Sequence, residues 1–139
     1  LLSDIAIRGK YQQVKTFGTS GGGCASLFYG VYLNANKSIS VGGRHPLTYK
    51  VTNNLLSDKG CSGYEFEKLL SKKSNQYQTN IYTIYGNRVN ADKISAEIFE
   101  KYFLNTSLVP IDHDGHNVIE YLRNKQELRL FLDELVNYE

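Results

Sequence analysis

Short β-branched and aromatic runs alternate with helical patterns along this chain, and this alternation constrains the fold more than any other feature. Four runs predict strands, at 14–17, 38–41, 81–85 and 107–111. Apolar residues recur at helical spacing at 22–33, 64–73, 91–104 and 118–136, and residues 3–12 suit the end of a helix. The order predicts an α/β fold, a three-layer sandwich with a mainly parallel sheet of about four strands.

Polar and nucleophilic side chains follow three of the predicted strands. Ser20 comes after the first strand, a loop at 87–92 after the third, and a loop at 112–116 after the fourth. In parallel sheets of this kind the ligand site lies at the carboxyl ends of the strands. Because the strand predictions alone placed these segments, we expect them to meet in one site.

The turn Gly18-Thr19-Ser20-Gly21-Gly22 has the pattern Gly-x-Ser-x-Gly between a predicted strand and a predicted helix. In that setting the serine occupies a sharp, strained turn, and the flanking glycines let strand and helix approach each other. The Gly21 N–H then points toward a developing oxyanion at a helix N-terminus. The alternatives are a glycine-rich phosphate-binding turn or a merely tight turn. The Lys-Ser/Thr ending of a P-loop and the Gly-x-Gly-x-x-Gly order, which typify phosphate binding, are both missing. We therefore predict that Ser20 is a nucleophile.

A general base for Ser20 is expected in the loop after the last strand, where His113 and His116 both lie. Gly115 would ease a turn that aims the His116 ring across the sheet, which favours His116. His45 follows the second strand and could line the pocket, although a lone histidine in a long loop is more often at the surface.

The catalytic acid is harder to predict. A Gly-x-x-Asp pattern after the third strand would put an aspartate where this chain has Val89. Asp92 is the candidate, and its roles as catalytic acid and as N-cap or first-turn residue of a helix stay equally open. Asp58 could replace it, whereas Asp114 is too close in sequence to His116 to be the obvious partner.

These features resemble the C-terminal half of an α/β-hydrolase. Gly18-Thr19-Ser20-Gly21-Gly22 resembles its nucleophile elbow and Gly115-His116-Asn117 its histidine loop. More narrowly, residues 18–41 and 115–122 look like hydrolase-like domains of bacterial surface-polysaccharide biosynthesis proteins. The resemblance implies a partial α/β-hydrolase fold, with residues 1–139 as a single domain from the C-terminal part of a longer protein.

The same resemblance implies a serine ester hydrolase or acyltransferase, acting on a small-molecule or glycan ester. The family has four further strands before the elbow, and a loop among them supplies a second oxyanion donor. We therefore expect this chain alone to be a poor catalyst, and strand 14–17 to be an edge that pairs with the missing N-terminal part or another chain. The alternative is a non-catalytic interaction domain, favoured by Val89 and by the absent half.

Composition excludes several other classes of protein. A net charge of +2 is too mild to argue for nucleic acid, and no apolar run approaches the ~20 residues of a membrane span. Cys24 and Cys61 have no metal-ligand spacing, so two free thiols in a cytoplasmic protein are expected, with a disulfide as the alternative. The glycine pattern also argues against dinucleotide binding. No cofactor or metal is predicted.

Overall fold

The computed structural model describes residues 11, 13–45, 48 and 77–137. Its sheet contains four parallel strands in the order β1-β2-β3-β4, which confirms the predicted α/β class. The strands are β1 (Lys15–Thr19), β2 (Lys37–Val41), β3 (Asn80–Gly86) and β4 (Thr106–Ile111). All four predicted strands are present, with boundaries that differ by at most two residues. β1 and β4 form the two edges.

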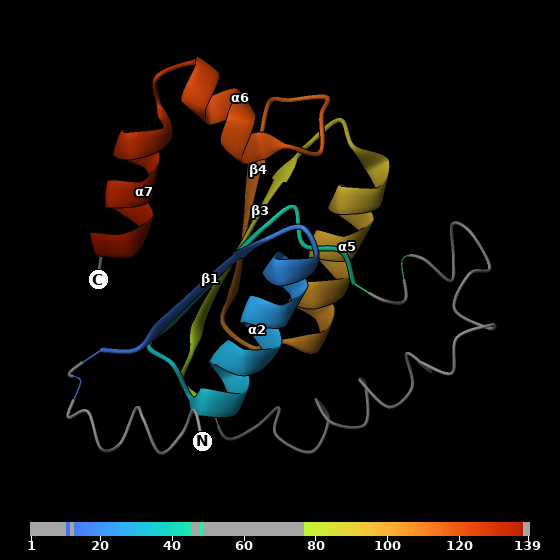
Figure 1. Cartoon of the computed structure of the whole chain (residues 1–139). Coiled ribbons are helices and arrows are strands. Elements are labelled where there is room, and N and C mark those ends of the chain that lie inside the picture. The colour runs from blue at the N-terminus through green and yellow to red at the C-terminus, as the bar shows by residue number, and fades with distance from the viewer. Residues whose placement is uncertain (1–10, 12, 46–47, 49–76, 138–139) are drawn as a thin grey trace.

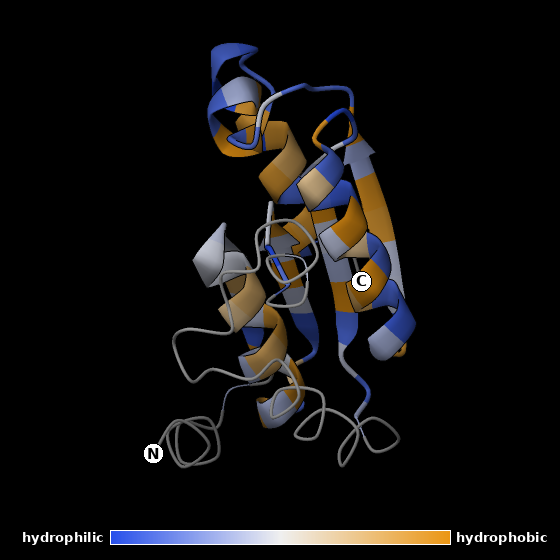
Figure 2. Ribbon diagram, turned by 90° about the vertical axis from the view of Figure 1, so that its right-hand side faces the viewer, coloured by the Kyte–Doolittle hydropathy of each residue, from blue (hydrophilic) through white to orange (hydrophobic). Residues whose placement is uncertain are grey.

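Helices cover both faces of this sheet (Figure 1). α2 (Gly21–Leu33) and α5 (Asn90–Tyr102) lie on one face, and α6 (Val118–Asn124) and α7 (Leu128–Asn137) on the other. Strand alternation separates two apolar cores: Ile81 packs with α2 and α5, whereas Ile84 packs with α6. Figure 2 shows the hydrophobic residues along the sheet, between these helix layers. The result is the expected three-layer sandwich.

Small residues face each other where α2 packs on β2. A Cβ at Gly30 would come 2.7 Å from Ser38 Cβ, and one at Gly23 would come 2.8 Å from Ser40 Oγ. Larger side chains at these glycines would push the helix away from the sheet. Since the N-terminus of α2 carries the Ser20 turn, this close packing also positions that turn.

The prediction of one helix at 118–136 is wrong, because the chain turns between α6 and α7. Gln126 has a left-handed backbone with a φ of 62°. The Gln126 N–H donates to Arg123 O at 3.0 Å and the Glu127 N–H donates to Leu122 O at 2.9 Å. These two bonds form a Schellman motif, which ends a helix by satisfying its last carbonyls. Periodicity missed the break because no glycine or proline marks it.

The helix predicted at 64–73 lies outside the described residues, as do Asp58, Cys61 and nearly all of the helix end predicted at 3–12. Cys24 is a free, buried thiol of the first core, and burial raises its pKa to about 12. In the described part of the chain, no helix has both the length and the apolar character needed to cross a bilayer.

Candidate active site

Ser20 sits on a strained turn between β1 and α2. Its φ of 52° and ψ of −123° are uncommon for a residue with a side chain, and such conformations cost on the order of 1–3 kcal/mol. The Ser20 N–H donates to Val41 O at 2.8 Å, and Ser20 O accepts the Gly23 N–H at 2.9 Å. These bonds hold the turn, and they leave Ser20 exposed at the carboxyl edge of the sheet.

The glycines around Ser20 are not equivalent. A Cβ at Gly18 would lie 2.0 Å from Gly22 O, so the strand and the helix can approach only because position 18 has no side chain. A Cβ at Gly21 or Gly22 would meet nothing within 4 Å. The expectation that glycines on both sides of the serine serve the close approach is therefore right for Gly18 but wrong for Gly22, where a side chain would have room.

His116 reaches Ser20 from the loop after β4. Its Nε2 lies 3.0 Å from Ser20 Oγ, which is hydrogen-bonding distance, although 96 residues separate the two in sequence. The His116 side chain is 34% exposed, so the ring remains partly open to solvent beside Ser20. The structure thus brings together the serine and the histidine that the sequence selected.

Asp92 completes the arrangement from the first turn of α5. Its carboxylate is fully buried, and Oδ2 lies 2.6 Å from His116 Nδ1. The N-cap of α5 is Val89, so Asp92 occupies the first turn and is not the N-cap. The first-turn position of Asp92 is confirmed, and it also brings the carboxylate to the histidine.

This geometry sets the tautomer of a neutral His116. A carboxylate only accepts hydrogen bonds, so the Nδ1 that faces Asp92 carries the proton. Nε2 is then the lone-pair nitrogen, and the Ser20 hydroxyl donates to it. A hydroxyl that donates to an imidazole oriented by a carboxylate has the hydrogen-bond pattern of an activated nucleophile.

The rival histidine His113 lies elsewhere in the same loop. Its ring stacks on Tyr121 with centroids 4.1 Å apart, and its Nδ1 lies 3.6 Å from the exposed Asp114 carboxylate. A Cβ at Gly115 would come 2.6 Å from His113 Nε2. Gly115 therefore makes room for the His113 ring.

His45 is buried, so the expectation of a surface histidine is wrong, and it does not line the cavity at Ser20. Its ring packs edge-on against Phe99 of α5 at 5.2 Å, and its backbone N–H donates to Ser95 Oγ at 3.2 Å. These contacts bind His45 to α5, which is why its ring lies in the core.

Two residues of the site escaped the sequence reasoning. Arg44 Nε lies 2.8 Å from Asp92 Oδ1. Gly42 has a φ of 58°, and a Cβ there would come 3.1 Å from the His116 ring. Both follow β2, so the only available signal was their position at the carboxyl end of a predicted strand.

A cavity of about 230 Å³ lies beside the serine and the histidine. Its other lining residues are Thr19, Val41, Asn117, Val118 and Ile119.

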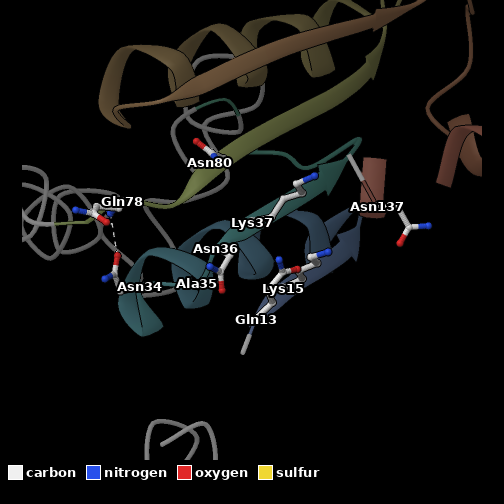
Figure 3. Close-up of a pocket in the computed structure, with 9 residues that line it drawn as sticks. All are labelled: Gln13, Lys15, Asn34, Ala35, Asn36, Lys37, Gln78, Asn80 and Asn137. Atoms are coloured by element: carbon white, nitrogen blue, oxygen red, sulfur yellow. Dashed lines mark hydrogen bonds between the residues drawn. The ribbon is translucent and has the colours of Figure 1, made fainter. Parts of the chain in front are cut away.

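A larger cavity of about 590 Å³ lies at the opposite, amino-terminal edge of the sheet (Figure 3). There Lys15 and Lys37 donate to the carbonyls of Val136 and Leu135, so these lysines hold the C-terminal end of α7. Ser20, His116 and Asp92 are not among the residues that line this larger cavity.

No family model, curated protein or solved structure matches this chain. The functional interpretation therefore depends on the fold and on the geometry of the residues at this edge of the sheet.

Proposed function

We propose that this protein is a serine hydrolase or acyltransferase in which Ser20 is the nucleophile, His116 the general base and Asp92 the residue that orients it. The observation that carries the proposal is the continuous hydrogen-bonded chain of the three side chains, with distances of 3.0 Å and 2.6 Å. A substrate with an ester carbonyl suits an oxygen nucleophile of this type. The resemblance to polysaccharide-biosynthesis domains favours an O-acyl glycan among such esters.

In the proposed reaction Ser20 Oγ attacks the ester carbonyl carbon while His116 Nε2 takes the hydroxyl proton. The Asp92 carboxylate stabilises the imidazolium that forms. The bond from the carbonyl carbon to the leaving oxygen then breaks, and Nε2 returns the proton to that oxygen, which releases an alcohol and leaves an acyl-serine. Water or an acceptor alcohol then gives its proton to His116 Nε2 and attacks the acyl carbon. The bond from that carbon to Ser20 Oγ breaks, and Nε2 returns the proton to Oγ, which restores the free serine.

The N-terminus of α2 supplies one donor for the oxyanion in this reaction. Gly21 is the first residue of the helix, so its N–H has no acceptor within the helix, and the helix dipole adds favourable potential. The loss of one such donor reduces a rate by roughly 100–1000-fold, so we expect this N–H to contribute strongly to the proposed reaction.

A non-catalytic interaction domain is the second candidate. In the described part of the chain, β1 pairs only with β2, so its other edge presents unpaired backbone groups. Such an edge can add a strand from another segment or another chain. In this alternative the Ser20 turn would be retained as a structural element without turnover.

A serine-directed fluorophosphonate probe distinguishes the two candidates. We expect the probe to label the whole protein by bonding its phosphorus to Ser20 Oγ with loss of fluoride, and Ser20→Ala to abolish the labelling. Ser107→Ala is the matched control, because Ser107 lies exposed on the edge strand β4. If the wild-type protein is not labelled, or if Ser20→Ala is labelled as fast as Ser107→Ala, the catalytic proposal is wrong.

A further inference from the structure

The buried carboxylate of Asp92 has two partners that approach its two oxygens separately. Arg44 Nε lies 2.8 Å from Oδ1 and His116 Nδ1 lies 2.6 Å from Oδ2. The Asp92 side chain is fully buried, whereas that of Arg44 is 29% exposed. A partly exposed arginine and the histidine therefore contact different oxygens of the same buried carboxylate.

A carboxylate in such a position needs both partners. Burial of a charge is strongly unfavourable unless the charge is paired and hydrogen-bonded. His116 provides only one hydrogen bond, and in the neutral tautomer it provides no charge. The guanidinium supplies the positive charge and the donor for the remaining oxygen, and charge-assisted bonds of this kind are short and strong.

Two bonds to two different oxygens also restrict rotation of the carboxylate group. With Oδ1 held by Arg44, the plane of the carboxylate and the direction of Oδ2 are set, and Oδ2 in turn sets the orientation of the His116 ring. A histidine ring that can rotate moves Nε2 away from Ser20 Oγ, and a misplacement of about 1 Å can reduce a rate on the order of 100-fold.

We infer that Arg44 is a positioning residue for the proposed acyl-transfer site, one that holds the Asp92 carboxylate in the orientation that aligns His116 with Ser20. This inference rests on the proposed function for its effect on rate, but the Arg44–Asp92–His116 geometry can be tested separately. Arg44 is not among the residues that line the cavity at Ser20, so it acts through Asp92.

The test compares Arg44 variants of the whole chain by two measurements. The first is the rate constant of fluorophosphonate labelling at saturating probe, together with the probe concentration at half-saturation. The second is the NMR signal of the His116 Nδ1 proton, which resonates far downfield while its bond to the carboxylate protects it from exchange. Thermal unfolding shows whether each variant folds, and Arg44→Gln replaces Arg44→Ala if the alanine variant does not fold.

We expect Arg44→Ala to lower the saturating rate by about 10–100-fold with little change in the half-saturating concentration, and to broaden or remove the Nδ1 signal. Arg44→Lys keeps a positive charge and one donor toward Oδ1, so it should restore the signal and most of the rate. Arg88→Ala is the matched control, because Arg88 forms an ion pair of 2.7 Å with Asp112 in which both side chains are exposed. It should leave both measurements unchanged.

The outcomes separate the two proposals. A protein whose Nδ1 signal depends on Arg44, but which the probe never labels, supports the positioning role and refutes the catalytic function. A labelled wild-type protein whose Arg44→Ala variant retains both the rate and the Nδ1 signal refutes the positioning role and leaves the catalytic function standing. Loss of rate in Arg44→Lys equal to that in Arg44→Ala, with the signal intact in both, also contradicts the inference.

Discussion

Gly18 and Gly22 flank Ser20 symmetrically in sequence, yet the structure predicts opposite effects for their replacement by alanine. A Cβ at Gly18 would lie 2.0 Å from Gly22 O, a contact that only a backbone shift can relieve. Overpacking of this kind destabilises a protein by about 1–3 kcal/mol. A Cβ at Gly22 meets nothing within 4 Å and lies inside α2, where alanine is better than glycine by about 0.5–1 kcal/mol.

Equilibrium urea unfolding measures both variants. With a slope of about 1–3 kcal/mol per molar urea, a change of about 2 kcal/mol moves the midpoint by roughly 1 M. We expect Gly18→Ala to lower the midpoint by that order and Gly22→Ala to raise it slightly. Because Gly18 also sets the approach of β1 to α2, Gly18→Ala should slow labelling of Ser20, whereas Gly22→Ala should not. If Gly18→Ala is as stable as Gly22→Ala, close approach is not why position 18 is glycine.

Two further predictions concern buried ionisable side chains. Asp92→Asn should reduce the rate of fluorophosphonate labelling by a factor on the order of 10⁴, because the amide disrupts the tautomer and orientation of His116. Asp112→Asn is its control, because the Asp112 side chain is exposed. Equal labelling rates in the two variants would refute the role of Asp92. Burial raises the pKa of the Cys24 thiol from 9.0 to about 12, so the unfolded chain loses this proton at a lower pH than the folded chain does. The free energy of unfolding should therefore fall as the pH rises from about 9 toward 12, by at most about 1.4 kcal/mol per pH unit. Urea unfolding at pH 8 and pH 10 in a Cys61→Ala background should show this loss. Adding Cys24→Ala should reduce it to the smaller part due to Tyr77 and Tyr85, because burial also raises the pKa of these two tyrosines. A loss that Cys24→Ala leaves unchanged would assign the effect to other groups.

Local patterns were sufficient for the strands and for two of the site residues. Short β-branched and aromatic runs that end at a turn are typical of strands, and all four strands have this pattern. Because the carboxyl ends of such strands meet at one edge, Ser20 and His116 could be selected before any contact was known. Their distance of 3.0 Å agrees with that selection.

Sequence reasoning identified Asp92 as a candidate but could not decide whether it contacts the histidine. A carboxylate in the first turn of a helix has a sufficient local explanation in the helix dipole, so its type and position do not reveal a second partner. Only the packing of α5 beside β3 and β4 brings its Oδ2 to 2.6 Å from His116 Nδ1.

The sequence by itself determined the class of fold, the loops that follow the strands and the turn at Ser20, because these depend on patterns within a few neighbouring residues. The tertiary structure alone decided the pairing of Arg44 with Asp92, the burial of His45 and the break between α6 and α7. The first two depend on contacts between segments far apart in the chain. The third depends on the left-handed backbone of Gln126, a conformation that a glutamine in the sequence does not predict. The hydrogen-bonded residues at this edge of the sheet therefore combine a serine whose position could be predicted locally with a partly buried ion pair that only the packed layers create.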